Sequence, residues 1–399
     1  MPHVSLRGGQ MPSSPIRKLA PLARAAKEQG VKVYHLNIGQ PDLPTPQKGL
    51  DALKHVTRKT LEYSPSEGYA SLREKLALYY RQLGIGLSPE EIIVTTGASE
   101  AILFAFMACL DPGEEMIMME PGYANYISFA NTAGIRVRPV TSTLEEGFAL
   151  PPAEAFEQAI TPATRAILLC NPSNPTGYVY TREELLKIKE IVLRHNLFLF
   201  ADEVYREFIY NGEPFLSTLS LGMDENVVMI DSVSKRYSEC GIRIGMVVTR
   251  NREVRETVMK YCQARLSPPL LGQLVAEASI EDAEAYLQAC HDEYKARRDF
   301  FIEGLNRIPG VVSPMPQGAF YTVASLPVDD AEDFCRWLLT DFRLDGETVM
   351  MAPAAGFYSN PALGRKQVRL AYVLKIEDLQ RCLVLLEEAL KQYPNGQAG

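Results

Sequence analysis

The stretch "EIIVTTGASEAILFAFMACLDPGEEMIMMEPGY", residues 91–123, places a helical segment between two short apolar segments. The same alternation of apolar, β-rich runs with amphipathic stretches extends from about residue 68 to residue 265. Strands that are apolar along nearly their whole length are typical of a parallel sheet covered by helices on both faces. The sequence therefore predicts an α/β fold with a mostly parallel sheet.

One pair of apolar runs departs from this pattern. "VVMIDSVSK" at 227–235 and "IRIGMVV" at 242–248 are separated by only a few residues. A parallel crossover needs a dozen residues or more, so the second run is predicted to be an antiparallel strand.

The last third of the chain has a different pattern. "DAEAYLQACHDEYKARRDFFIEGLNRIPG", at 282–310, predicts one long helix that ends at Pro309 and Gly310. Residues 311–399 then alternate strands and helices in an α+β pattern, and the proline-rich N-terminal segment is expected to join them. We predict a large domain at 47–298, and a small domain made of 1–46 and 299–399.

Composition narrows the class of protein. The chain of 399 residues has a formal net charge of -8 and no basic face, which argues against nucleic acid or an anionic membrane as a partner. Its seven cysteines show no metal-binding spacing and suggest reduced thiols, and no metal site is expected. No signal-peptide core or apolar run of about 20 residues stands out, so we expect a cytoplasmic protein.

In open α/β sheets, ligands bind at the carboxyl ends of the parallel strands. The segments expected there are "TTGASE", "EPGYANY", "CNPSNPTG", "ADEVY" and "DSVSKRYS". No GxGxxG, GxxxxGK[ST], HExxH or GxSxG motif is present, so dinucleotide, P-loop, metalloprotease and α/β-hydrolase chemistry have no motif to support them.

Each polar residue at these strand ends has an ordinary explanation by itself. Asp202 is favoured as a helix N-cap, Asn174 can fix a turn, and Lys235 can be solvated. Arg243 fits a surface ion pair and Arg369 an edge-strand charge. Together they supply an amine nucleophile, a buried carboxylate, an anion cradle and a second guanidinium, which is the set that pyridoxal 5'-phosphate needs.

The ordered motifs "NPSNPTG", "ADEVY", "SVSK" and "GIRIG" closely resemble those of the fold type I, class I aminotransferases, and most closely the aspartate-aminotransferase-like subgroup. The resemblance extends from "NIGQPD" to "VRLAYVL", which is nearly the whole chain. It implies a fold type I transferase, with a seven-stranded sheet in the large domain and a helix near residue 290 as the hinge for domain closure. It also implies a cytoplasmic enzyme of amino acid metabolism that works by ping-pong chemistry.

The resemblance also implies roles for individual residues. Lys235 is expected to form the internal aldimine with pyridoxal phosphate and then to move the substrate proton. Asp202 is expected to hold the pyridinium nitrogen, Tyr205 and Asn174 the phenolic oxygen, and Tyr123 to stack on the ring. Many relatives carry tryptophan at that stacking position, but the only tryptophan here, Trp337, lies elsewhere in the chain.

The remaining implied roles concern the phosphate and the substrate. The phosphate is expected to contact the backbone N–H groups of Ala98 and Ser99, the hydroxyls of Ser232 and Ser234, and Arg243. Tyr63 is expected to reach the phosphate of a neighbouring subunit, which implies a homodimer with shared active sites. Arg369, Asn174 and Gly39 are expected to bind the substrate α-carboxylate.

The amino-acid substrate is less well defined. One branch of the family binds a second carboxylate with an arginine where this chain has Cys262, and another with a lysine where it has Ser99. Arg265 is a possible substitute, although an interface or surface position explains it equally well. We expect aspartate or glutamate as the amino donor, with 2-oxoglutarate as acceptor. Cys240 is expected to be a small core filler.

Two other functions remain open at this point. A PLP-dependent β-lyase or cyclase of the same fold would use the same lysine and aspartate. A non-catalytic PLP-binding regulator would carry a fused DNA-binding domain, for which the roughly 45 residues before the core leave no room.

Overall fold

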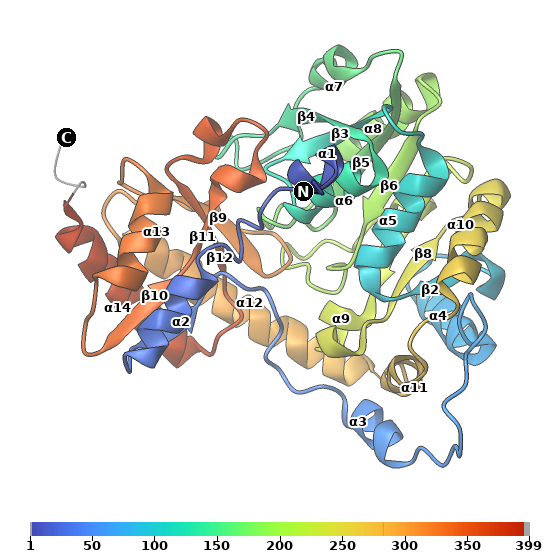
Figure 1. The fold of residues 1–399 in the computed structure, drawn as a ribbon, viewed down its shortest axis with the longest axis horizontal. Helices are drawn as coiled ribbons and strands as arrows, with labels where there is room; N and C mark the ends of the chain where they lie inside the picture. Colours follow the sequence, from blue (N-terminus) through green and yellow to red (C-terminus); the bar gives the residue numbers. More distant parts are fainter. Residues whose placement is uncertain (1, 282, 395–399) are drawn as a thin grey trace.

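The computed structural model describes residues 2–281 and 283–394 (Figure 1). Its largest sheet has seven strands in the order β2-β8-β7-β6-β5-β3-β4. Strand β8 is antiparallel to both of its neighbours, whereas the other strand pairs are parallel. The strands are β2 (Ile92–Thr95), β3 (Glu115–Glu120), β4 (Arg136–Thr141), β5 (Thr164–Cys170), β6 (Phe198–Asp202), β7 (Val227–Ser232) and β8 (Gly245–Val248). The predicted α/β fold, its seven-stranded sheet and the antiparallel direction of the last strand are confirmed.

Both faces of this sheet are buried. Alternate residues of β2 and β3 belong to two separate apolar clusters, with Val94 and Ile117 in one, and Ile93 and Met116 in the other. The first cluster includes buried residues of α4 (Ala70–Gln82) and α8 (Arg182–Arg194), and the second includes those of α5 (Gly97–Cys109) and α10 (Arg252–Arg265). Burial on both sides explains why these strands are apolar along their whole length.

The N-terminal and C-terminal parts of the chain share a third apolar cluster. Strand β1 (Lys32–His35) pairs in parallel with β10 (Glu347–Met350). A three-stranded antiparallel sheet has the order β11-β12-β9. Figure 1 shows α2, in blue, beside the orange and red C-terminal elements. The further helices and strands of these two parts are α2 (Ala20–Glu28), β9 (Tyr321–Ser325), β11 (Ala352–Pro353), β12 (Gln367–Ala371), α13 (Ala331–Thr340) and α14 (Ile376–Gln392).

The predicted long helix is α12 (Glu284–Arg307), which lies along α14. Residue 282, the first of the predicted helix, lies outside the described residues, as do residues 1 and 395–399 of the predicted small domain. The domain limits at 46/47 and 298/299 stay a prediction. The remaining α-helices are α1 (Leu6–Gly9), α3 (Gln47–Lys54), α6 (Asn125–Ala133), α7 (Ala153–Ala159), α9 (Val233–Arg236) and α11 (Leu270–Ser279).

Within the described part of the chain, no helix is both long enough and apolar enough to cross a membrane. The same residues contain no cluster of three or more His, Cys, Asp or Glu side chains that could bind a metal ion.

Candidate active site

A cavity of about 710 Å³ lies at the carboxyl ends of the central strands. It is also bordered by segments from the N-terminal and C-terminal parts of the chain. Of the predicted site residues, all line it except Tyr63 and the alternative candidate Arg265. The lining comprises Gly39, Ala98, Ser99, Tyr123, Asn174, Asp202, Tyr205, Ser232, Ser234, Lys235, Arg243 and Arg369, together with Ser14, Ile16, Arg17, Ile38, Gln40, Ile102, Asn125, Tyr126, Phe129, Cys170, Val204, Cys240 and Tyr321.

Lys235 lies on the short helix α9, directly after β7. Its Nζ donates a hydrogen bond of 2.8 Å to the carbonyl oxygen of Gly39. The Ser232 hydroxyl caps α9 by accepting from the backbone N–H of Ser234, and it donates to the carbonyl oxygen of Ile244. These contacts hold the lysine at the end of the strand with its amine in the cavity.

The antiparallel strand β8 brings Arg243 back beside Lys235. Arg243 has a left-handed backbone with a φ of 60°. A Cβ on Gly97 would overlap the Arg243 guanidinium, and a Cβ on Gly245 would overlap the backbone of Gly97 and Ala98. These two glycines therefore let β8 and the guanidinium approach the N-terminus of α5, where free N–H groups favour an anion such as a phosphate.

Asp202 ends β6 and is buried, with 4% of its surface exposed. It does not cap a helix: one carboxylate oxygen accepts a 2.6 Å hydrogen bond from the Tyr126 hydroxyl, and the other accepts from the N–H of Val204. Burial raises its pKa to about 6. No cation of the described residues forms an ion pair with Asp202. The carboxylate therefore lacks a positive partner, which the protonated ring nitrogen of pyridoxal phosphate would supply.

Arg369 is a buried cation without an acidic partner. It is 2% exposed, and its guanidinium donates to the carbonyl oxygen of Asn37 and, at 3.3 Å, to Oδ1 of Asn174. Its Nε has no hydrogen-bond partner, and burial lowers its pKa. A planar guanidinium that lines a cavity and has no acidic partner fits a carboxylate ligand.

Two tyrosines that the sequence analysis did not select also belong to this site. Tyr321, on β9, shares a 2.9 Å hydrogen bond with the Tyr205 hydroxyl, and its ring packs under the Arg369 guanidinium. Tyr126 donates to Asp202, as described above. Tyr126 follows Tyr123 by three residues, and its ring packs edge-on against that of Tyr123. This spacing in the sequence could have indicated that Tyr126 belongs to the site.

A buried charge network anchors the segment that carries Lys235. Arg236, next to Lys235, donates a 2.6 Å hydrogen bond to Asp231, which also accepts from the Tyr80 hydroxyl. Arg206 lies 3.5 Å from Asp231 and 3.3 Å from Glu203. All four charged side chains of this Asp231–Arg236 network are buried.

The comparisons with known proteins agree with this geometry. The family profile described as "Aminotransferase class I and II" matches residues 31–382. The chain belongs to the class I and II aminotransferases.

Several members of this PLP-dependent, fold type I family are similar over almost their whole length. The Thermus thermophilus aspartate/prephenate aminotransferase is 32% identical over 90% of this chain and 91% of its own, and the Thermotoga maritima aspartate aminotransferase is 31% identical over 97% and 99%. A solved single mutant of the Thermus thermophilus aspartate aminotransferase superposes with a TM-score of 0.89 at 31% identity, covering 98% of this chain and all of the other. Pyrococcus furiosus alanine aminotransferase superposes with a TM-score of 0.90 at 29% identity and the same coverage.

One interpretation from the sequence needs correction in this aminotransferase. Cys240 is not a core filler, because it is only half-buried and lines the cavity. Its Sγ lies 3.8 Å from Lys235 Nζ and 3.3 Å from the carbonyl oxygen of Ser234.

Two further residues lie away from the aminotransferase cavity. Tyr63 is 76% exposed on this chain. Arg265 donates to the carbonyl oxygens of Ser66 and Val94, and its guanidinium lies 3.4 Å from the Glu100 carboxylate. The acidic partner of Arg265 is thus within its own chain.

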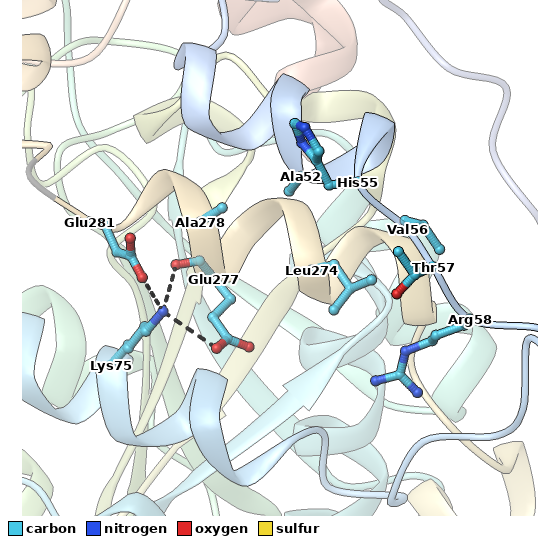
Figure 2. A pocket seen from close by; sticks show the side chains of 10 residues that line it. All are labelled: Ala52, His55, Val56, Thr57, Arg58, Lys75, Leu274, Glu277, Ala278 and Glu281. Atoms are coloured by element: carbon cyan, nitrogen blue, oxygen red, sulfur yellow. Dashed lines mark hydrogen bonds and ion pairs between the residues drawn. The ribbon is translucent and has the colours of Figure 1, made fainter.

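A second cavity, of about 290 Å³, lies among α3, α4 and α11 (Figure 2). Its Lys75 forms ion pairs with Glu277 and Glu281. Because this cation is already neutralised and none of the strand-end residues is nearby, the second cavity does not offer the chemistry of the first.

Proposed function

We propose that this chain is a pyridoxal-phosphate-dependent aminotransferase that moves the amino group of an L-amino acid to a 2-oxo acid such as 2-oxoglutarate. The amino donor is aspartate or another dicarboxylic amino acid. The observation that carries the proposal is one cavity in which an amine, a buried carboxylate without a cation, and a buried guanidinium without an anion lie together. Relatives named as aspartate aminotransferases support the substrate class.

The residues present fit the cofactor. Asp202 would hold the protonated ring nitrogen, Asn174 and Tyr205 would donate to the phenolic oxygen, and Tyr123 would pack against the ring. The N–H groups of Ala98 and Ser99, the hydroxyls of Ser232 and Ser234, and Arg243 would hold the phosphate. When bound, pyridoxal phosphate supplies a ring that accepts the electrons left on the substrate Cα after proton loss.

The protein groups would orient the substrate and move its proton. Arg369 would bind the α-carboxylate with two parallel hydrogen bonds and fix the direction of the Cα–H bond. Lys235 is the amine in the cavity, so its Nζ would take the proton from the substrate Cα and hold it for transfer within the site. Burial of Arg369 strengthens its attraction for the carboxylate, because little solvent screens the pair.

The proposal includes a homodimer in which Tyr63 contacts the phosphate of the partner subunit. Leu61, two residues away, is exposed as well, and neighbouring apolar side chains exposed to solvent support an interface role for this segment.

A half-reaction tests the proposed function. Cofactor-loaded protein mixed with L-aspartate alone is expected to release one equivalent of oxaloacetate per site and to lose the absorbance of the aldehyde form of the cofactor. Lys235→Ala is the matched control; it is expected to fold, to bind cofactor without a borohydride-reducible link, and to lack the half-reaction. Release of pyruvate and ammonia from a β-substituted donor such as L-cysteine, with no half-reaction on L-aspartate, would identify a β-lyase. A full yield of reducible link in Lys235→Ala would reassign the lysine.

A further inference from the structure

The cavity carries more positive charge than the proposed roles use. Its lining includes four cationic side chains, Arg17, Lys235, Arg243 and Arg369, but a single carboxylate, Asp202. The cofactor phosphate accounts for Arg243, the cofactor aldehyde for Lys235, and the substrate α-carboxylate for Arg369. Arg17 is left as a cation without an assigned anion.

Arg17 also lacks a partner within the protein. Its guanidinium forms no ion pair or side-chain hydrogen bond with any residue that the structure describes, in contrast to Lys18, which pairs with Glu332. Its charge acts on the Tyr123 hydroxyl: burial raises the pKa of Tyr123 to about 12, and the charges of Arg369 and Arg17 oppose that rise. Arg17 lines the same cavity as Tyr123.

The segment that carries Arg17 is fixed at the cavity. Pro15 and Leu19, on either side of it, are buried, and Pro15 packs against Gly356, where a Cβ would not fit. Its turn is closed by the N–H of Arg17, which donates to the carbonyl oxygen of Ser14 at 3.1 Å. The backbone position of Arg17 is thus defined although its side chain is exposed.

Asn37 joins this segment to the arginine proposed for the α-carboxylate. Its side-chain N–H donates a 3.0 Å hydrogen bond to the carbonyl oxygen of Ile16, while its own carbonyl oxygen accepts from Arg369. Asn37 is 2% exposed. One buried residue therefore holds both guanidinium-bearing elements, and both arginines line the same cavity.

We propose that Arg17 binds the side-chain carboxylate of the substrate and makes the enzyme selective for dicarboxylic amino acids and oxo acids. This inference rests on the proposed function, and it names the residue that sets the substrate class. Arg17 acts at the far end of the substrate from the reacting Cα, so it is a specificity residue and takes no part in proton transfer. Other branches of the family bind the second carboxylate with a lysine at position 99 or an arginine at position 262. In this chain an arginine from the N-terminal segment takes that role.

The test compares Arg17→Ala, Arg17→Lys and Arg24→Ala. Arg24, an exposed arginine of α2 outside the cavity, is the matched control for loss of one surface charge. Arg17→Ala loses a charge-assisted hydrogen bond to the substrate. The second-order rate constant for aspartate or glutamate, measured in single-turnover experiments, is therefore expected to fall about 10- to 100-fold. The rate constant for alanine is expected to change less than about 3-fold, because alanine has no second carboxylate. Arg17→Lys is expected to lie between wild type and Arg17→Ala.

Equilibrium binding separates this inference from the proposed function. Maleate, which cannot react, is expected to bind cofactor-loaded Arg17→Ala about 10- to 100-fold more weakly than wild type, whereas propionate binding stays unchanged. That result supports the role of Arg17 even if no amino acid is turned over, in which case only the proposed function fails. Equal losses for aspartate and alanine, or aspartate kinetics and maleate affinity like those of Arg24→Ala, overturn the inference.

Discussion

At the scale of single residues, the cavity contains charges that the protein alone does not neutralise. Asp202 is the clearest case, because its carboxylate is buried against Tyr126 and no cation of the described residues pairs with it. Transfer of an ionised carboxylate into a poorly solvated site is unfavourable, and the rise of its pKa to about 6 expresses that cost. The residue is therefore kept at the expense of the stability of the cofactor-free protein.

We predict that Asp202→Asn stabilises the cofactor-free protein at neutral pH and inactivates the enzyme. Between pH 3.8 and about 6 the folded chain holds a proton that the unfolded chain has released, so wild-type stability falls as pH rises through this window. Asparagine does not titrate, and the stability advantage of the variant should grow from pH 4 to 6 and then level off at no more than about 3 kcal/mol. Urea unfolding of both cofactor-free proteins from pH 4 to 8 measures it; an advantage independent of pH contradicts the assignment.

At the scale of elements, the site depends on how closely β8 approaches the N-terminus of α5. Gly245 begins β8, and a Cβ there would overlap the backbone of Gly97 and Ala98. Gly241, in the same "GIRIG" motif, faces open space, and its φ is not in the left-handed region. The two glycines of one motif thus have different physical requirements.

We predict that Gly245→Ala and Gly241→Ala differ sharply. Overlap at position 245 should push β8 from α5, lower stability by about 1–3 kcal/mol and weaken binding of pyridoxal phosphate about 10-fold or more. Gly241→Ala should keep stability within about 0.5 kcal/mol of wild type. Thermal unfolding and cofactor titration compare the variants, and equal behaviour of the two would refute the packing argument.

The elements that carry the site residues explain which of these residues could be predicted from the sequence alone. Asp202 and Lys235 were predictable because they stand at the ends of apolar strands in recognisable motifs, and these strand ends meet at one edge of the sheet. Arg243 was predictable because its motif opens the next strand, which a short loop forces to run antiparallel. Tyr321 was not, because it lies on β9 of a separate sheet, in a strand where the next three residues are buried as well. Arg17 was not, because it belongs to a turn with no periodic pattern, and nothing in the sequence indicates that this turn lines the cavity.

At the scale of the whole molecule, segments from both ends of the chain border one cavity. Arg17 and Gly39 come from the N-terminal part, and Tyr321 and Arg369 from the C-terminal part. Tyr63 instead projects from the surface, and the proposed dimer would give it a place in the partner's cavity. A site shared in this way has a consequence for mixed dimers.

We predict that two inactive variants complement each other. Tyr63→Ala should lower activity strongly with little effect on folding, since the side chain is exposed. In a hybrid dimer of Tyr63→Ala with Lys235→Ala, one site would carry both defects and the other neither. A re-equilibrated 1:1 mixture should therefore recover about a quarter of wild-type activity. Activity equal to the mean of the two parents would show that each site is built from one chain.

The Asp231–Arg236 network bears on what happens when the cofactor leaves. Opening the segment around Lys235 would separate Arg236 from Asp231 and leave Arg206, 3.5 Å away, as the remaining cation beside that buried carboxylate among the described residues. Loss of one partner from a buried ion pair is unfavourable. The segment should therefore stay formed in the cofactor-free protein, and its backbone amides should exchange with deuterium only through unfolding of the sheet. Empty enzyme would then be ready to rebind its cofactor without first rebuilding the site.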